Sequence, residues 1–365
     1  MLGADEFAAW FRLIETPGVS RGAARRLLAA CGSPERVLVA GPGLWRELGG
    51  PDAAAGLARP HQVVEERLAA ANFWLSGGEG RQAIAVGDPA YPALLLQTAD
   101  PPLLLYTQGD PARLSQRSVA VVGSRHATPQ GEANASAFSK ALSEQGWVVV
   151  SGLAMGIDGA AHEGALLGPA GTVAVVGTGL DRIYPPRHKG LAHRIALHGC
   201  IVSEYAPGTP ALPVHFPQRN RIIAGLSLGT LVVEAAVQSG SLITARMASE
   251  AGREVFAIPG SIHSPHAKGC HALLKQGAKL VESADDILEE LQTSSPRQAQ
   301  APSPQEPPLA DPLLQALGSD PVGLDELLGR TGWPVAELSA RLLTLELEGL
   351  VARLPGGLFQ AIHRA

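Results

Sequence analysis

Some of the residues best suited to chemistry in this 365-residue sequence lie in a short turn that follows an apolar run. Val122 ends that run and is followed by Gly123, Ser124 and Arg125, just before a segment with helical spacing. Glycine permits close approach of the backbone, the amides of a helix N-terminus attract anions, and Arg125 offers a two-pronged guanidinium. The turn therefore predicts a seat for a phosphate group. It lacks the Gly-x-Gly-x-x-Gly spacing of a dinucleotide-binding loop.

Basic side chains gather further along the chain, although the formal net charge of the whole sequence is -5. Between residues 182 and 221 they are Arg182, Arg187, Lys189, Arg194, Arg219 and Arg221, against the acid Glu204. The end of this stretch places Phe216 beside Arg219, Asn220 and Arg221. A ring for a base face, guanidinium groups for phosphates and an amide for base edges are the components of a single-strand binding site. A charge run is more often a solvated face, so the nearby aromatic ring is what favours binding.

Two patterns raise the alternative of an enzyme. Asp158 and His162 stand four residues apart on a helical segment, a spacing that suits acid/base chemistry but more often reflects a helix N-terminal acid and a packed histidine. The run 225–229 matches the Gly-x-Ser-x-Gly nucleophile elbow, but that elbow needs a strand before it and a helix after it, and here the expected order is reversed.

Cofactor signals are absent from the sequence as well. There is no Gly-Lys dipeptide and hence no P-loop, and neither the three cysteines nor any other residues have metal-ligand spacing. We expect no catalytic residue, no metal and no cofactor.

Seven apolar, β-branched runs must position these residues. They are 118–122, 147–151, 172–177, 200–203, 230–233, 254–258 and 278–281. Their nearly continuous apolar character indicates strands buried on both faces, and most of the intervening segments are long enough for crossover helices. The pattern predicts an α/β domain over 76–292, with a doubly wound, mostly parallel sheet and ligand loops at the carboxyl ends of its strands.

The flanking segments differ in texture. Residues 1–75 predict a small helical domain, in which 16–26 looks like either a helix-hairpin-helix element that holds a phosphate or an ordinary packing unit. Residues 293–308, rich in Pro, Gln and Ser, predict a linker. Residues 309–365 show three helical patterns and two strands around a Pro-Gly-Gly turn, the order of a winged helix. Four Arg oppose seven acids there, which favours a protein-contact or regulatory role over insertion into a DNA groove.

No apolar stretch reaches the roughly 18 residues of a membrane span, and the N-terminus has no secretory pattern. We therefore expect a soluble, cytoplasmic protein.

Over residues 91–291 the sequence resembles the DprA/Smf family. The matching blocks are 121–125, 151–154, 156–158, 161–162, 216–217, 219–227, 232–235, 239–245 and 258–260. The resemblance implies an extended Rossmann-like fold, a homodimer and no enzymatic activity. It also implies binding and protection of single-stranded DNA without sequence preference, and loading of the RecA recombinase in natural transformation and recombination. The implied nucleic-acid site comprises Gly123, Ser124, Arg125, Phe216, Arg219, Asn220 and Arg221, with Arg187 and Lys189 nearby.

The alternative is a nucleotide-cleaving, lysine-decarboxylase-like hydrolase, which has the same type of sheet and a Pro-Gly-Gly-x-Gly-Thr-x-x-Glu motif. Here the aligned run is 225–233, so Val233 stands at the catalytic Glu position. Glu234 comes one place late and falls on the other face of a strand. The shift argues against the hydrolase.

Overall fold

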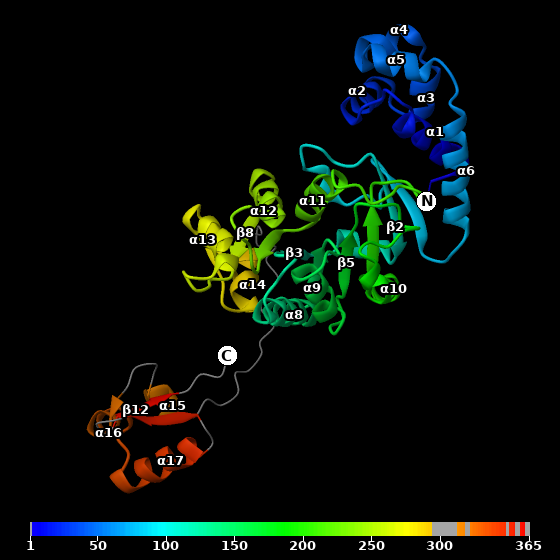
Figure 1. Cartoon of the computed structure of the whole chain (residues 1–365). Helices are drawn as coiled ribbons and strands as arrows, with labels where there is room; N and C mark the ends of the chain where they lie inside the picture. Colours follow the sequence, from blue (N-terminus) through cyan, green and yellow to red (C-terminus); the bar gives the residue numbers. More distant parts are fainter. Residues whose placement is uncertain (1, 294–311, 318–321, 348–349, 355–357, 362–365) are drawn as a thin grey trace. The chain divides into compact units, whose positions relative to one another are not determined.

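The architecture comes from a computed structural model that describes residues 2–293, 312–317, 322–347, 350–354 and 358–361 (Figure 1). The chain divides into two compact units, unit 1 over residues 1–296 and unit 2 over residues 297–365. No helix among the described residues is both long and apolar enough to cross a membrane.

Unit 1 begins with helices, as the spacing of apolar residues predicts. They are α1 (Ala4–Glu15), α2 (Arg21–Cys31), α3 (Pro34–Val39), α4 (Pro42–Leu44), the π-helical turn η1 (Trp45–Gly49), α5 (Pro51–Leu57) and α6 (Gln62–Ser76). Ser20 caps α2 by accepting a hydrogen bond from the Ala23 amide. All three basic side chains of α2 have intramolecular partners: Arg21 and Arg25 pair with Asp100, and Arg26 donates to the Leu48 carbonyl. These contacts are those that a packing unit would make.

A nine-stranded sheet forms the centre of unit 1 in the described residues. Its strands are β1 (Arg81–Ala85), β2 (Leu104–Gly109), β3 (Ser118–Val122), β4 (Val148–Ser151), β5 (Thr172–Val175), β6 (Cys200–Ser203), β7 (Gly229–Val232), β8 (Glu254–Ala257) and β9 (Lys279–Leu280). Their order is β1-β2-β6-β5-β4-β3-β7-β8-β9. Strands β3 to β9 pair in parallel, so the predicted doubly wound, mostly parallel sheet is confirmed. The strands β1 and β2, which the apolar runs did not predict, add an antiparallel edge.

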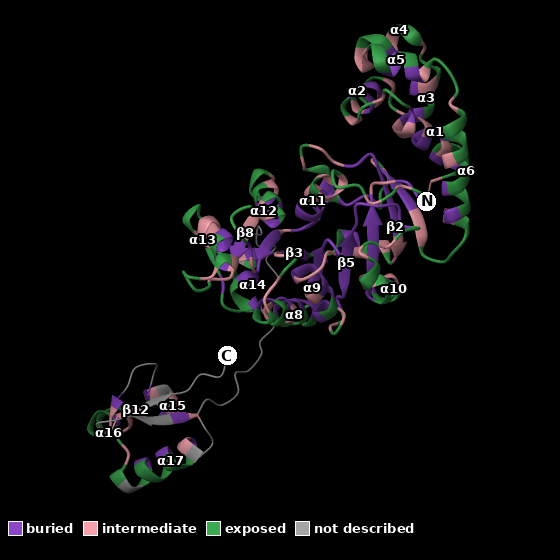
Figure 2. Cartoon of the chain, viewed as in Figure 1, coloured by how far each residue is buried: buried purple, intermediate pink, exposed green. Residues whose placement is uncertain are grey.

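Helices cover both faces of the sheet because neighbouring residues of a strand point to opposite sides. In β3, Val119 and Val121 join one hydrophobic core, whereas Ala120 and Val122 join another. The helical elements are α7 (Ala93–Leu96), η2 (Pro111–Ser115), α8 (Pro129–Glu144), α9 (Ile157–Ala165), η3 (Pro186–His188), α10 (Lys189–His198), α11 (His215–Leu226), α12 (Gly240–Glu250), η4 (Pro265–Ala267), α13 (Lys268–Lys275) and α14 (Ala284–Thr293). Figure 2 shows the buried strands between helices with exposed outer surfaces.

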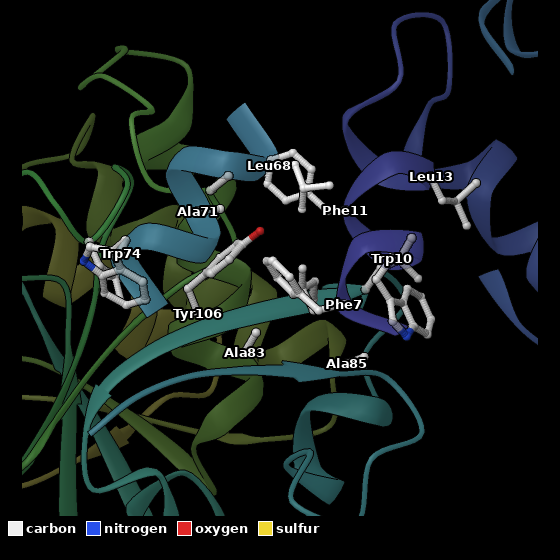
Figure 3. Close-up of a cluster of buried hydrophobic side chains, with 14 of the residues drawn as sticks. Phe7, Trp10, Phe11, Leu13, Leu68, Ala71, Trp74, Ala83, Ala85 and Tyr106 are labelled. Carbon is white, nitrogen blue, oxygen red and sulfur yellow. The ribbon is translucent and has the colours of Figure 1, made fainter. Parts of the chain in front are cut away.

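The N-terminal helices and the antiparallel edge share one hydrophobic core (Figure 3). The rings of Phe7 on α1 and Tyr106 on β2 meet edge to face, with centroids 6.3 Å apart. Leu68 and Trp74 of α6 are buried in the same core. This packing explains the position of β1 and β2, which the helices cover on one side.

Unit 2 has the predicted winged-helix order. It contains α15 (Pro312–Leu317), β10 (Val322–Gly323), α16 (Leu324–Thr331), α17 (Val335–Leu347), β11 (Val351–Leu354) and β12 (Leu358–Ala361). Its strands form an antiparallel sheet in the order β10-β12-β11 around a small leucine-rich core. Apart from Thr293, which ends α14, the predicted linker at 293–308 lies outside the described residues, as does the turn at 355–357.

Candidate functional site

A pocket of about 460 Å³ lies at the carboxyl ends of the central strands. From β3 the chain proceeds through β4 to β6 on one side, and it returns to β7 on the other side before moving outward to β9. Ligands of doubly wound sheets bind at such a reversal of strand order. Six of the nine predicted site residues line this pocket, which we call the Phe216 pocket: Gly123, Ser124, Arg125, Phe216, Arg219 and Asn220.

Arg125 and Phe216 are the two side chains in this pocket best placed to meet a ligand. Arg125 is exposed, and its guanidinium carbon lies 5.6 Å from the centroid of the Phe216 ring. No ion-pair partner of Arg125 occurs among the residues that the structure describes. An unpaired cation beside an aromatic face offers electrostatic attraction for a phosphate and a stacking surface for a ring.

Tyr184, which was not among the predicted site residues, is a neighbour of Phe216. Its ring packs on Phe216, with centroids 5.3 Å apart and planes inclined by 38°. The Tyr184 side chain is 49% exposed, so this aromatic surface extends beyond the pocket. The position of Tyr184 inside the basic stretch 182–221 could have marked it as a candidate site residue. Its contact with Phe216, however, arises only in the folded chain.

The expected helix N-terminal phosphate seat is already filled by Glu234. The Thr128 amide, at the cap of α8, donates to Glu234 Oε2 over 2.9 Å, and the Thr128 hydroxyl donates to Oε1 over 2.6 Å. The Ser124 amide donates to the Glu234 carbonyl over 2.8 Å. An internal carboxylate thus takes the place that an anion occupies at a helix N-terminus. The prediction that the Ser124 amide holds a phosphate is therefore not supported by the geometry.

Gly123 has a steric role in the same turn. A Cβ atom there would lie 2.6 Å from Cγ1 of Ile157 and 2.9 Å from the Glu234 carbonyl oxygen. Both approaches are too close for any larger residue, so glycine lets β3 and the Glu234 segment meet.

Arg219 lines the pocket but is directed into the protein. It is 4% exposed and donates to the carbonyls of Gly152 and Val175, which tie the ends of β4 and β5 together. A Cβ atom at Gly152 would lie 2.2 Å from the guanidinium, which explains the glycine in the Ser151-Gly152 turn. Burial, opposed by the attraction of Asp158 at 3.9 Å, lowers the pKa of Arg219 to about 10. The expectation that Arg219 holds a phosphate must be corrected, because its donors serve backbone carbonyls.

Asn220 is partly engaged in the same arrangement. Its side-chain oxygen accepts a hydrogen bond from Arg219 Nε over 3.0 Å, and its amide nitrogen donates to the Gly240 carbonyl over 3.4 Å. It links α11 to the start of α12 at the pocket wall.

Asp158 and His162 do not form a catalytic pair in this structure. His162 is fully buried, and burial, reinforced by the nearby His188 and Arg219 side chains, lowers its pKa to about 3. Its Nε2 accepts from the Leu153 amide over 3.2 Å, and its Nδ1 lies 2.7 Å from the Thr172 hydroxyl. The Thr172 hydroxyl donates to the Val149 carbonyl, so Nδ1 of His162 carries the proton and donates to Thr172.

The residue that His162 holds is strained. Leu153 has a φ of 59°, a conformation that costs a non-glycine residue of order 1–3 kcal/mol. Its carbonyl accepts a hydrogen bond from His188 Nδ1 over 2.9 Å, so one histidine holds the amide of Leu153 and another holds its carbonyl. The next residue, Ala154, lines the Phe216 pocket, and its amide donates to Asp158. Asp158, whose pKa burial raises, therefore belongs to the support of the pocket wall.

Arg221 does not line the Phe216 pocket. Its side chain is 12% exposed and pairs with Glu204 and, at 3.0 Å, with Asp100. Arg21 of α2 contacts the same two carboxylates, so this ion-pair cluster joins the N-terminal helices to α11 and β6. The expectation that Arg221 contacts a phosphate must also be corrected, because the guanidinium of Arg221 is paired with two carboxylates of the chain, those of Glu204 and Asp100.

The remaining predicted residues, Arg187 and Lys189, lie in separate hollows. Arg187 lines a shallow hollow of about 790 Å³ beside α9 and α10. Lys189, at the start of α10, lines a cavity of about 510 Å³ on the other side of that helix's first turn.

The enzyme motifs are not built as catalytic sites. Ser227, the serine of the elbow-like run, is fully buried and donates to the Ile223 carbonyl over 3.0 Å. Val233 stands where the hydrolase motif has its Glu, and the Glu234 carboxylate caps α8. Among the described residues, no three His, Cys, Asp or Glu side chains cluster as metal ligands would.

Comparison with known proteins gives consistent matches. Residues 82–292 match the family described as DNA recombination-mediator protein A, and residues 297–357 match the DprA winged helix domain. The chain is 43% identical over 310 residues to protein Smf of Escherichia coli K12, covering 82% of each chain. It is 44% identical over 214 residues to the DNA processing protein DprA of Bacillus subtilis 168, covering 58% of this chain and 72% of that protein.

Two solved structures are similar at the level of fold and sequence. DNA processing protein A from Streptococcus pneumoniae has a TM-score of 0.68 and 36% identity, covering 79% of this chain and 98% of that one. The protein from Helicobacter pylori, whose structure is described as showing a unique single-stranded DNA binding mode, has a TM-score of 0.53 and 29% identity, covering 58% of this chain and 96% of that one.

Proposed function

Because the chain belongs to the DNA recombination-mediator protein A family, also named DprA/Smf, we propose that it binds single-stranded DNA without sequence preference. In this proposal it protects incoming DNA in the cytoplasm and, as a homodimer, helps to load the RecA recombinase in natural transformation and recombination. The observation that carries the DNA-binding part is the exposed, unpaired Arg125 above the Phe216 ring in an open pocket. The single-strand binding described for the Helicobacter pylori relative supports the same reading.

The contacts support a separate role for each of these residues in the proposal. Arg125 holds a phosphate, Phe216 stacks a base and Asn220 faces the strand from the pocket wall. Arg219 supports the pocket by tying the ends of β4 and β5 together through the carbonyls of Gly152 and Val175. Stacking on a ring accepts every base, so this site favours single strands without selecting a sequence.

Local charge rather than net charge drives the attraction. The chain has a formal charge of -5, so a polyanion is repelled by the molecule as a whole and attracted only where unpaired cations gather. Unit 2, whose α17 carries Glu337 and Glu346 on a candidate recognition helix, serves protein contacts in this proposal.

The hydrolase alternative has weaker support. A catalytic carboxylate must reach a bound nucleotide, whereas the Glu234 carboxylate is occupied by the amide and hydroxyl of Thr128. We therefore assign the chain no catalytic residue, metal or cofactor.

A binding titration tests the proposed function. Fluorescence anisotropy with labelled single-stranded and duplex oligonucleotides, repeated over a salt series, should give tighter binding of single strands that weakens steadily with salt. Equal affinities for homopolymers of different base would support the lack of sequence preference. Tighter binding of the duplex, or affinity independent of salt, would contradict the proposal.

A further inference from the structure

The cavity that contains Lys189, which we call the Lys189 cavity, is built by elements far apart in the sequence. Arg81 of β1 pairs in register with Gln108 of β2, and Gln108 pairs with Ile201 of β6. Directly paired residues project from the same face of a sheet, so these three side chains form one row along the cavity. Trp74 of α6 closes the cavity next to Arg81, and its ring lies 5.0 Å from the Arg81 guanidinium carbon.

Helix α10 supplies the opposite wall. Lys189, Ala192, His193 and Ala196 all line the cavity. Their spacing of three, four and seven residues places them on one face of the helix. The Lys189 cavity therefore exists only because α6 and the antiparallel edge pack opposite α10.

The rim of the Lys189 cavity is basic. Arg81, Arg182 and Lys189 line it, and Asp181 is the acid among its lining residues. Asp181 is already engaged, because its carboxylate accepts a hydrogen bond from the Gly208 amide over 2.7 Å and lies 3.5 Å from Arg182 Nε. Lys189 has no ion-pair partner in the part of unit 1 that the structure describes.

The floor of the Lys189 cavity is apolar. Leu153, Val176 and Ile201 form it, and the volume of about 510 Å³ falls in the range of ordinary ligand sites. An inorganic anion gains nothing from such a floor, whereas a nucleotide presents both an apolar ring and a phosphate. The combination of apolar floor and cationic rim therefore fits a nucleotide.

Only a thin wall separates the two binding spaces. Leu153 lines the Lys189 cavity and the next residue, Ala154, lines the Phe216 pocket. Ile183 and Pro186 also line the Lys189 cavity, while Tyr184 between them packs on Phe216. The exposed Tyr184 ring thus lies where one space gives way to the other.

We propose that Tyr184 continues the strand-binding surface from the Phe216 pocket into the Lys189 cavity, where Arg182 and Lys189 hold phosphates of further nucleotides of the same strand. Successive bases can stack on neighbouring rings, and the Tyr184–Phe216 contact provides two such rings in sequence. This inference rests on the proposed function. The inference also assigns α6 and β1 a role in binding the strand, because Trp74 and Arg81 of these elements complete the Lys189 cavity.

A length series of oligothymidylate separates the two spaces. Full-length protein is titrated with labelled strands from about 3 to about 20 nucleotides, a range that brackets the site sizes of single-strand grooves. For the shortest strands whose binding can be measured, Tyr184→Ala and Lys189→Ala should have the same affinity as the wild type. For longer strands, their affinity should be about tenfold lower than that of the wild type. Lys189→Ala should also lower the salt slope for long strands by about 0.7, the value of one phosphate contact. Tyr184→Phe, which keeps the ring, should retain wild-type affinity at every length.

Two further variants make the result decisive. Lys140→Ala removes an exposed cation on α8 that pairs with Glu144 and lines neither of the two spaces, and it should change nothing. Arg125→Ala should weaken short and long strands alike. If Tyr184→Ala and Lys189→Ala, folded as judged by circular dichroism, bind long strands like the wild type or weaken all lengths equally, the extension is refuted. If Arg125→Ala also binds every length like the wild type, the failure lies in the proposed function itself.

Discussion

The guanidinium of Arg125 lies over the ring of Phe216, with 5.6 Å between the guanidinium carbon and the ring centroid. Arg125 comes from the end of β3 and Phe216 from the first turn of α11, so the contact joins segments that are 91 residues apart in the chain. In the proposed function, the cation and the ring make two contributions to DNA binding that respond differently to salt. A phosphate contact releases counterions, whereas base stacking does not.

Removal of the Arg125 cation should therefore flatten the salt dependence of binding. For Arg125→Ala we expect the slope of log K against log salt on a single strand to fall by about 0.7, because one phosphate contact is lost. Anisotropy titrations at several salt concentrations measure it, with Lys140→Ala as the charge-matched control. An unchanged slope in a folded variant would place the phosphate contact elsewhere.

Removal of the Phe216 ring should act on affinity alone. Phe216→Ala should weaken single-strand binding by about 1–3 kcal/mol with nearly the wild-type salt slope, since a stacking surface is lost and no charge. The same titrations serve as the measurement. A loss of slope comparable to that of Arg125→Ala would contradict a stacking role.

Arg221 should matter for stability rather than for DNA contacts. In Arg221→Ala the carboxylates of Glu204 and Asp100 lose a partner in a largely buried cluster, which costs roughly 3 kcal/mol, near the lower end of such changes because Arg21 remains. Chemical denaturation measures the free energy of unfolding. Arg194→Ala is the control, because its pair with Glu163 is exposed and is worth under about 1 kcal/mol. A stable Arg221→Ala protein with a reduced salt slope would return Arg221 to the binding site.

His162 should make the stability of unit 1 depend on pH. Its pKa is about 3 in the folded protein and 6.5 in an unfolded chain, so below pH 6.5 the unfolded state takes up a proton that the folded state does not. The stabilisation is complete above pH 6.5 and is lost as the pH falls towards 3, by at most about 1.4 kcal/mol per pH unit. His162→Gln keeps a donor and an acceptor but does not titrate.

Urea denaturation of both proteins at pH 7, 6 and 5 tests this expectation. The wild type should lose more stability than His162→Gln over that interval. Equal losses in the two proteins would mean that His162 is not held neutral.

Glu234→Gln addresses the hydrolase alternative and the helix cap together. We expect neither the wild type nor the variant to release free base from nucleoside monophosphates, while the variant loses about 1 kcal/mol of stability because the Thr128 amide loses its charged acceptor. Chromatography of the reaction mixture and a denaturation curve provide the two measurements. Steady base release by the wild type that Glu234→Gln abolishes would favour the hydrolase.

The sequence alone determined the central sheet and the winged helix of this protein. Six strands of the sheet could be predicted because largely buried strands are apolar almost throughout, as 118–122 and 172–175 are. The run 278–281 also forms a strand, β9, but Lys279 and Leu280 are exposed, so the expectation that this strand is buried on both faces was wrong. Strands β1 and β2 escaped prediction because they carry polar residues such as Arg81 and Gln108; β1 is the edge strand, and β2 lies between β1 and β6. Their burial depends on α1 and α6, which pack on them from the N-terminal region.

For the proposed binding site, the residue types could be found in the sequence, but which of them are free to meet a ligand depends on the tertiary structure. Arg219 and Arg221 stand two apart on α11, and residues so spaced point to nearly opposite sides of a helix. The packing of α11 on the sheet decides that Arg219 meets the ends of β4 and β5 and that Arg221 meets Glu204. Both side chains therefore have partners within the protein. Arg125 remains available because it forms no ion pair within the described part of the chain, although its charge opposes the effect of burial, which raises the pKa of Asp158 in the same pocket. The contact between Tyr184 and Phe216 also depends on the tertiary structure, because long-range packing brings the two rings together.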